Sequence, residues 1–322
     1  MQILAGDIGG TNTRLALLEE SGKVLQSRQT FSSKNYPDLK TIVQEFLGKI
    51  VPDIACFGIA GPVEGSICRA TNLPWIVDSR ALEKETKIQT VYLINDLVAN
   101  AYGTQVLQEE DVLVLHSGTP QVGNQALISP GTGLGEAGMF WIKNHLHPFS
   151  SEGGHADFAP VGALQEELLL FLRRKFSGHI SYERVLSGPG LKNIYLFLTE
   201  EKKQEAIPTS VERPDFPKYI TKNALEGACP ACIETLNLFL AIYGAEAGNL
   251  ALKFLAVGGV YLGGGIVPHI APLLKKDLFM RSFLEKGRFR SLLQNIPVKV
   301  VLNDQAALLG ALEFAIIESG LR

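Results

Sequence analysis

The start of the chain alternates short apolar runs with one polar, glycine-rich turn. Residues 3–5 (Ile-Leu-Ala) and 15–18 (Leu-Ala-Leu-Leu) flank the sequence Gly-Asp-Ile-Gly-Gly-Thr-Asn-Thr-Arg of residues 6–14. Short apolar runs bounded by turn residues are typical of β-strands. The pattern therefore predicts a β-hairpin with this turn at its tip, followed by a third strand over residues 23–31.

An amphipathic helix and two buried strands follow. Apolar residues recur at positions 39, 42, 43, 46 and 47, the spacing of one helical face. Continuous apolar runs at residues 54–60 and 91–94 predict buried strands, with a short helix between them that Asp78 or Ser79 can cap. Three strands, then alternating helices and strands, predict an α/β layer with an antiparallel edge.

The same pattern returns later in the chain. Residues 126–129 and 137–142 predict two strands around the glycine turn of residues 130–135. Asn95-Asp96 ends an apolar strand and opens an Ala-rich and Gly-rich helix suited to close helix packing, and Asn303-Asp304 does so again. Similarity at this separation predicts a duplicated domain.

The segment between the two copies is mainly helical. Helices are expected over residues 164–176, around Glu183 and over residues 191–198, and a long buried helix over residues 231–255. Residues 200–218 are charged and rich in proline, which predicts an exposed loop. Residues 257–265 predict a strand that runs into a third glycine turn, and residues 297–302 predict the last strand.

Composition narrows the class of protein. The 322 residues are 46% hydrophobic and 20% charged with a net charge of −3, as expected for a globular enzyme of about two domains. No basic run predicts a nucleic-acid partner, and no apolar run is long enough to predict a membrane span. Four cysteines and the absence of a signal-peptide pattern favour the cytoplasm.

The glycine turns carry the first chemical signal. Glycine lets backbone N–H groups approach an anion, but a carboxylate such as Asp7 beside a phosphate requires a divalent cation. The first turn alone fits either nucleotide phosphates with Mg²⁺ or a plain hairpin. Residues 133–138 match G-x-G-x-x-G, but residues 138–142 predict a strand where a dinucleotide fingerprint needs a helix. Three glycine turns at strand ends favour a nucleotide held between two similar domains.

A resemblance to a known family rests on seven motifs. In chain order they are Gly6-Asp7-Ile8-Gly9-Gly10-Thr11-Asn12, Thr71-Asn72, Ile94-Asn95-Asp96, Gly131-Thr132-Gly133-Leu134-Gly135, Glu152-Gly153-Gly154-His155, Glu183-Arg184-Val185-Leu186-Ser187-Gly188-Pro189-Gly190 and Gly263-Gly264-Gly265-Ile266-Val267-Pro268. The chain resembles the bacterial-type glucokinases of the hexokinase, actin and heat-shock-ATPase superfamily. This implies a two-domain actin-like ATPase (ribonuclease H-like) fold, a duplicated βββαβαβα core with a ligand cleft between domains. The smaller domain would hold residues 1–106 and 300–322, and the larger residues 107–299.

The resemblance also implies how ATP is bound. Phosphate contacts are assigned to Gly6, Asp7, Ile8, Gly9, Gly10, Thr11 and Asn12 in the first turn and to Gly131, Thr132 and Gly133 in the second. The third turn, Gly263, Gly264 and Gly265, is assigned to adenosine. Mg²⁺ would bridge the phosphates without a direct protein ligand, although Asp7 could reach it through water.

Asp96 is the catalytic residue that the resemblance implies. Transfer of a phosphoryl group to a sugar needs a carboxylate that accepts the hydroxyl proton, and a strand-end Asp suits that role. The alternative is that Asp96 caps a helix, which is the role favoured for Asp304.

The resemblance makes Asn72, Asn95, Glu152, His155 and Glu183 sugar ligands, together with Asp96 itself. Carboxylates accept hydrogen bonds from sugar hydroxyls, and Glu152 and His155 share a loop that two glycines make pliable. The single pair Cys229 and Cys232 lacks the four ligands of a structural zinc site, so these residues are assigned to packing.

The expected activity is ATP-dependent phosphorylation of the 6-hydroxyl of glucose, and the resemblance implies a homodimer. Three alternatives stay open: a kinase for another hexose such as mannose or fructose, a non-catalytic sugar-sensing protein of the same superfamily, and an actin-like or chaperone ATPase. Hexose preference and the choice among ATP, ADP and polyphosphate as donor also stay open.

Overall fold

The computed structural model describes residues 1–19, 24–207 and 209–320. The chain divides into two compact units, one made of Met1–Asp111 and Asn303–Arg322 and the other of Val112–Leu302. Each unit has its own sheet and its own hydrophobic core, so the protein is of mixed α/β class.

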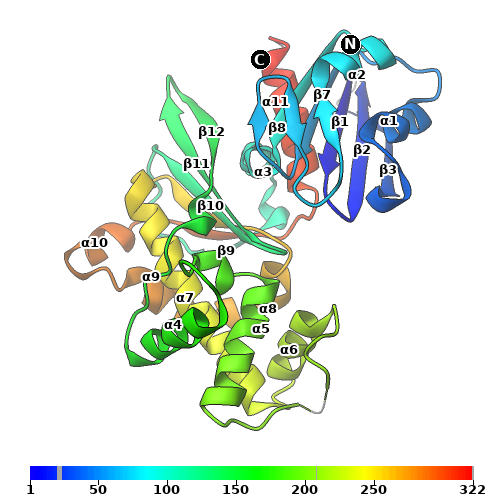
Figure 1. Cartoon of the computed structure of the whole chain (residues 1–322). Coiled ribbons are helices and arrows are strands. Elements are labelled where there is room, and N and C mark those ends of the chain that lie inside the picture. The colour runs from blue at the N-terminus through cyan, green and yellow to red at the C-terminus, as the bar shows by residue number, and fades with distance from the viewer. Residues whose placement is uncertain (20–23, 208, 321–322) are drawn as a thin grey trace. The chain divides into compact units, whose positions relative to one another are not determined.

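The sheet of the first unit has the strand order β3-β2-β1-β4-β8 (Figure 1). Its strands are β1 (Gln2–Ile8), β2 (Asn12–Glu19), β3 (Val24–Ser32), β4 (Ile54–Ile59) and β8 (Thr90–Asn95). The first three strands pair antiparallel, while β4 and β8 continue the sheet parallel to β1. The predicted hairpin, third strand and two buried strands are confirmed.

Parallel pairing aligns the strand ends that carry the predicted site. Ile8 pairs with Ile59, and Ile59 pairs with Asn95, so β1, β4 and β8 end together. The carboxyl edge of an open α/β sheet is where ligands ordinarily bind. The first glycine turn and the Asn95-Asp96 pair therefore lie along one edge.

Helices cover both faces of this sheet because its central strands alternate side chains between two apolar layers. Leu4 and Ile8 pack with α1 (Leu39–Leu47) and α2 (Ser79–Thr86), whereas Ile3 and Ala5 pack with α3 (Asp96–Gly103) and α11 (Ala306–Glu318). Asp78 caps α2 by accepting a hydrogen bond from the N–H of Arg80.

Close packing of α3 against α11 depends on glycine. A Cβ atom at Gly310 would lie 1.7 Å from the carbonyl oxygen of Ala99, so no larger residue fits there. This explains the Ala-rich and Gly-rich helices that follow both Asn-Asp pairs.

A small sheet in the first unit was not predicted. It consists of β5 (Val63–Glu64), β6 (Ile67–Arg69) and β7 (Ile76–Asp78) in that order. Strands of two or three residues are too short to show a period of alternation. The sheet leads the chain into the turn that carries Asn72.

The second unit repeats the strand order of the first and adds one strand. Its sheet is β12-β11-β10-β13-β14-β9, with β10 parallel to β13 and β13 parallel to β14. The strands are β9 (Val112–His116), β10 (Gln125–Pro130), β11 (Leu134–Ile142), β12 (His145–Ser151), β13 (Gly259–Leu262) and β14 (Val298–Val301). Because Gly133 leads into strand β11 and not into a helix, the dinucleotide fingerprint is excluded.

The core of the second unit is built around α7 (Pro230–Phe254), a long helix buried on most sides as predicted. The other helices are α4 (Ala163–Lys175), α5 (Gly188–Leu196), α6 (Phe216–Leu225), α8 (Val267–Leu274), α9 (Asp277–Leu284) and α10 (Arg290–Leu293). The 3-10 turns η3 (Gly153–His155) and η4 (Tyr182–Arg184) carry predicted site residues. Cys229 and Cys232 are free thiols buried at the start of α7.

The expected exposed loop over residues 200–218 is partly wrong. Phe216 opens α6 and is fully buried, because its ring packs edge to face on Tyr195. The prolines of this stretch masked a helix that starts with proline in its first turn. In the described part of the chain, no single helix could cross a membrane, although the bent pair α6 and α7 passes by length and composition alone.

Candidate active site

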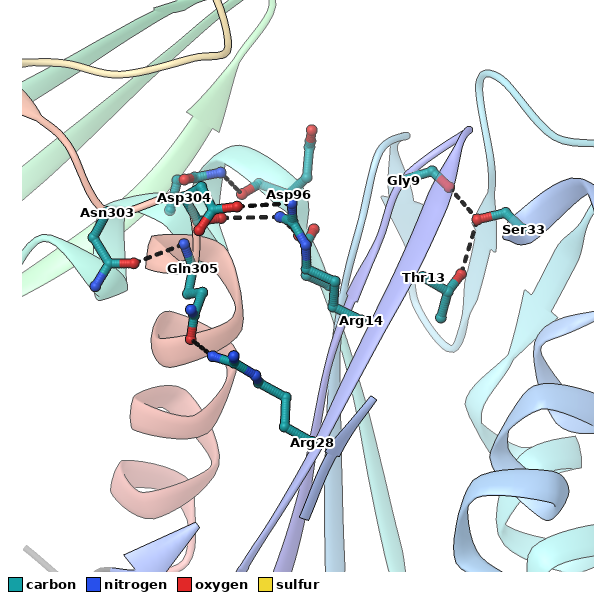
Figure 2. Close-up of polar contacts among 11 residues, drawn as sticks. Gly9, Thr13, Arg14, Arg28, Ser33, Asp96, Asn303, Asp304 and Gln305 are labelled. Atoms are coloured by element: carbon teal, nitrogen blue, oxygen red, sulfur yellow. Dashed lines mark hydrogen bonds and ion pairs between the residues drawn. The ribbon is translucent and has the colours of Figure 1, made fainter. Parts of the chain in front are cut away.

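The first glycine turn is held by backbone and hydroxyl hydrogen bonds. The N–H of Gly9 donates to the carbonyl oxygen of Asn12 at 2.9 Å, which closes the turn. The hydroxyl of Ser33 donates to the carbonyl oxygen of Gly9 at 2.7 Å and lies 3.0 Å from the hydroxyl of Thr13 (Figure 2). Ser33 thus ties the turn to the end of β3, a contact that sequence reasoning missed.

Asn72 lies against the first glycine turn. A Cβ atom at Gly10 would be 2.6 Å from the Cβ of Asn72, so glycine is required for this approach. The N–H of Thr71 donates to the carbonyl oxygen of Ala60 at 2.8 Å, which fixes the Asn72 turn at the end of β4. The structure therefore brings a predicted phosphate turn and a predicted sugar ligand together.

Asn95, and not Asp96, is the N-cap of α3. Its side-chain oxygen accepts from the N–H groups of Leu97 at 2.9 Å and Val98 at 3.4 Å, and its amide donates to the carbonyl oxygen of Gly61 at 3.2 Å. The alternative of Asp96 as the cap is therefore wrong. Asp96 is the half-buried first residue of α3.

The negative charge of Asp96 acts on the neighbouring thiol of Cys68. Burial raises the pKa of Cys68 to about 11, and the negative charge of Asp96 adds to this effect. The carboxylate of Asp96 therefore lies near enough to the buried thiol of Cys68 to act on it electrostatically.

Arg14 joins the acid of the first turn to the second Asn-Asp pair. Its guanidinium lies 3.3 Å from a carboxylate oxygen of Asp7. It also lies 3.0 Å from a carboxylate oxygen of Asp304 (Figure 2). Burial raises the pKa of Asp7, and the nearby positive charge of Arg14 opposes that shift. Opposite charges at paired positions of the hairpin, Asp7 and Arg14, are the signal that could have revealed this contact.

The expectation that Asp304 caps the last helix is wrong. Gln305 occupies the N-cap position of α11 without a side-chain cap, and the carboxylate of Asp304 pairs with Arg14 instead. Asn303 accepts from the N–H of Gln305 at 2.9 Å, and Gln305 in turn accepts from Arg28. A local analogy between the two Asn-Asp pairs could not show a contact with an arginine near the start of the chain.

In the second unit, the second and third glycine turns are neighbours. The N–H of Gly131 donates to the carbonyl oxygen of Gly133 at 2.8 Å, and that of Ile266 donates to the carbonyl oxygen of Pro130 at 3.3 Å. At Gly264 the φ angle is +89°, and a Cβ atom would lie 2.4 Å from that same proline oxygen. Only glycine meets both conditions, so the third turn can rest on the second.

Glu183 reaches the second glycine turn. Its carboxylate accepts a hydrogen bond from the N–H of Leu134 at 3.0 Å, and a Cβ atom at Gly133 would lie 2.4 Å from the same carboxylate oxygen. The structure thus places a predicted sugar ligand directly beside a predicted phosphate turn. One backbone donor at the end of that turn is already engaged by this acid.

Glu152 and His155 stand on a loop beside the same turn. Their side chains are 77% and 57% exposed, and Nε2 of His155 lies 4.0 Å from a carboxylate oxygen of Glu152. A Cβ atom at Gly154 would lie 2.1 Å from the carbonyl oxygen of Leu134, so the loop packs on the start of β11. Exposed acid and imidazole groups on a supported loop can contact hydroxyl groups of a ligand.

Each unit therefore gathers part of the predicted site. The first brings together the first glycine turn, Asn72 and the Asn95-Asp96 pair, and the second brings together the other two turns, Glu183 and the 152–155 loop. Within the described ranges, no group of three His, Cys, Asp or Glu side chains could hold a metal ion.

Comparison with known proteins covers nearly the whole chain. Residues 4–316 match the family model described as Glucokinase. The glucokinase of Nostoc punctiforme is 42% identical over 331 residues, which span 96% of this chain and 97% of that protein.

Solved structures show the same fold. A glucokinase from an Antarctic psychrotroph is 32% identical with a TM-score of 0.85, and the match covers 98% of both chains. A ROK family glucokinase from Streptomyces griseus, in complex with glucose and AMPPNP, is 21% identical with a TM-score of 0.66 over 98% of this chain and 99% of that one. At that identity the second likeness is one of fold alone.

Proposed function

The chain belongs to the glucokinase family, and we propose that it transfers the γ-phosphoryl group of ATP to the 6-hydroxyl group of glucose. The observation that carries this proposal is the family match over nearly the full length of the chain. The edge formed by β1, β4 and β8 supports it, because that edge gathers a glycine turn, amide side chains and a carboxylate.

Asp96 is the proposed general base. It would accept the proton of the 6-hydroxyl as the oxygen attacks the γ-phosphorus, while the other groups position the reactants and balance charge. Its place at the carboxyl end of β8 supports this role, as does the cap made by Asn95, which leaves the helix end without need of the Asp96 carboxylate.

The proposed sugar ligands are Asn72, Asn95, Glu152, His155 and Glu183 together with Asp96. Hydroxyl groups of glucose would donate to the carboxylates and accept from the amides, and the imidazole can do either. Exposure of Glu152 and His155 supports direct contact with a ligand. The amide of Asn95 is already bonded within the protein, so it would contact the sugar through its remaining hydrogen-bonding capacity.

The first and second glycine turns are the proposed phosphate contacts, and the third is the proposed adenosine contact. Backbone N–H groups of such turns suit phosphate oxygens. Mg²⁺ would neutralise charge on the β- and γ-phosphates. Mg²⁺ in such sites usually keeps several waters, and the half-buried carboxylate of Asp7 would reach it through one of them.

The proposal extends to the architecture and the setting of the enzyme. The shared order of five strands supports a duplicated actin-like ATPase core, with Met1–Asp111 and Asn303–Arg322 forming one domain and Val112–Leu302 the other. We further propose a homodimer in the cytoplasm, and the four buried free cysteines suit a reducing compartment.

A coupled assay with the purified protein tests the function. Glucose, mannose and fructose are each combined with ATP, ADP or polyphosphate in the presence of Mg²⁺, and Asp96→Asn serves as the control for contaminating kinases. We expect glucose with ATP to give the highest kcat/KM. Absence of turnover with every hexose, or equal turnover by the Asp96→Asn variant, would contradict the proposal.

A further inference from the structure

Glu136 is a buried acid to which the proposed reaction gives no role. It lies in β11 with its side chain 1% exposed, and both carboxylate oxygens are buried without a hydrogen-bond partner among the described residues. A buried polar atom without a partner costs free energy, and a carboxylate costs most in its charged form. Such a group in a native protein calls for an explanation.

The position of Glu136 connects it to the 152–155 loop. A Cβ atom at Gly153 would lie 2.1 Å from Oε2 of Glu136, so the backbone of the loop rests directly on this carboxyl group. The hydroxyl of Ser151 donates to the carbonyl oxygen of Glu136 at 3.1 Å and accepts from the N–H of Gly153 at 3.2 Å. Glycine at 153 therefore serves close approach between the loop and β11.

The charged groups around Glu136 come from several elements. On α7, Glu246 is fully buried and pairs with Lys253 at 3.1 Å and with the amide of Asn249 at 2.8 Å. Lys286 and the hydroxyl of Tyr182 also contact that amide, at 2.6 Å and 3.1 Å. The loop itself adds Glu152 and His155.

This environment disfavours a charge on Glu136. Burial, and then the negative charge of Glu246, raise the pKa of Glu136 to about 7, while Lys253 opposes the shift. The carboxyl group therefore changes charge close to neutral pH, under a loop that carries another acid, Glu152.

We propose that Glu136 is a positioning residue for the sugar loop, residues 152–155: the neutral carboxyl group lets the loop pack on β11, and the carboxylate disfavours this packing and weakens glucose binding. The carboxylate needs water, and water can reach it only if the loop moves away from β11. The inference rests on the proposed roles of Glu152 and His155 as sugar ligands.

The test is the pH dependence of KM for glucose in the full-length protein. Wild type, Glu136→Gln and Glu166→Gln are compared from about pH 5.5 to about pH 8.5, the last as a matched change at an exposed position of α4. If glucose binds only while Glu136 is neutral, KM of the wild type should depend on pH. One pH unit above the pKa of Glu136, it should be about tenfold higher than its value at low pH. Glu136→Gln should lose this rise and keep kcat, while Glu166→Gln should follow the wild type.

The outcomes separate this inference from the proposed function. No turnover of glucose by the wild type would overturn the proposed function itself. An active wild type whose pH profile for KM is shared by Glu136→Gln would overturn the role of Glu136, as would a fall in kcat with unchanged KM. Glu166→Gln changes an acid at an exposed position away from the loop, so a pH profile altered in Glu136→Gln alone identifies Glu136 as its source.

A double-mutant cycle tests the contact without reference to pH. Gly153→Ala should raise KM for glucose because its methyl group collides with the Glu136 carboxyl group. In a Glu136→Ala background the collision is gone, so Gly153→Ala should raise KM less. The fold increase there should be smaller by about threefold or more than the fold increase in the wild-type background. Equal effects of Gly153→Ala in both backgrounds would overturn the proposed contact.

Discussion

The two units share an order of five strands but obtain the acids at their glycine turns from different places. In the first hairpin, Asp7 and Arg14 face each other across the strands. The equivalent positions of the second hairpin hold Ser129 and Gly135, which carry no charge. The second turn receives its acid from outside the hairpin, as Glu183 of η4.

This difference suggests a division of labour within one repeated framework. Acids at strand ends, such as Asp7 and Asp96, are held rigidly by the sheet and suit the reacting phosphate and hydroxyl groups. Acids on loops, such as Glu152 and Glu183, suit recognition of the sugar. We therefore expect loss of the strand-end acids Asp7 and Asp96 in the first unit to lower kcat, and loss of the loop acids Glu152 and Glu183 in the second to raise KM for glucose.

The largest effect is expected for Asp96→Asn. Loss of the general base should lower kcat about 10²–10⁴-fold, because the amide cannot accept the hydroxyl proton. Glucose binding should persist, since positioning groups remain. Steady-state kinetics measures kcat, and calorimetric titration with glucose measures binding, so the two effects can be separated. A variant that turns over normally would remove the assignment of Asp96, and one that cannot bind glucose would make it a sugar ligand first.

The next effect is expected for Glu152→Gln in the second unit. Loss of a charge-assisted hydrogen bond of about 1.5–3 kcal/mol should raise KM for glucose roughly 10-fold to 100-fold. This rise should exceed any change in KM for Asp96→Asn, whereas kcat should change less than in that variant. Glu167→Gln, at an exposed position of α4, is the matched control. Identical KM values for wild type and Glu152→Gln would break the proposed division between the units.

A third effect compares two acids whose pKa is raised by burial, one in each unit. Asp7 has Arg14 beside it, whereas Glu136 has no such partner among the described residues. The folded pKa of Glu136 is raised from 4.5 to about 7. Between those values the unfolded chain binds fewer protons than the folded one, so the stability that the neutral group contributes is lost as pH rises through that window.

Glu136→Gln should therefore gain stability over the wild type as pH rises from about 5 to about 8. The gain should be at most about 3 kcal/mol, since one pKa unit corresponds to roughly 1.4 kcal/mol. Thermal unfolding at both pH values measures it. A constant difference in Tm between the two proteins would show that Glu136 is already ionised in the folded protein near pH 5.

The fold was predictable where one short stretch of sequence determines one element. The β1–β2 hairpin follows from a glycine turn between apolar runs, and α1 follows from its apolar spacing. The sheet β5-β6-β7 was missed because its strands are shorter than the pattern that identifies a strand. Helix α6 was missed because its burial depends on α5 and α7, which the local sequence does not show.

The candidate site divides in the same way. Glycine turns and the Asn95-Asp96 pair could be read from motifs, because their chemistry is local. Glu136 could not, since the loop that packs on its carboxyl group and the charge of Glu246 on α7 that acts on it come from distant parts of the sequence. Asp304 was assigned wrongly for the same reason, because its partner Arg14 comes from the opposite end of the chain.

The smallest effect is expected for Asp304→Asn, the counterpart of Asp96→Asn in the second Asn-Asp pair. The Asp304 side chain is 72% exposed, so loss of its pairing with Arg14 should cost under about 1 kcal/mol of stability. Asp304 is also one of the charges that raise the pKa of Asp7, so its removal should lower that pKa slightly. Arg14 keeps its contact with Asp7, and kcat should stay close to the wild-type value.

Turnover and Tm of the two Asp→Asn variants, measured side by side, give the comparison. If Asp304→Asn lost as much turnover as Asp96→Asn, the two pairs would be chemically equivalent, and the distinction between a base and an ion-pair partner would fail.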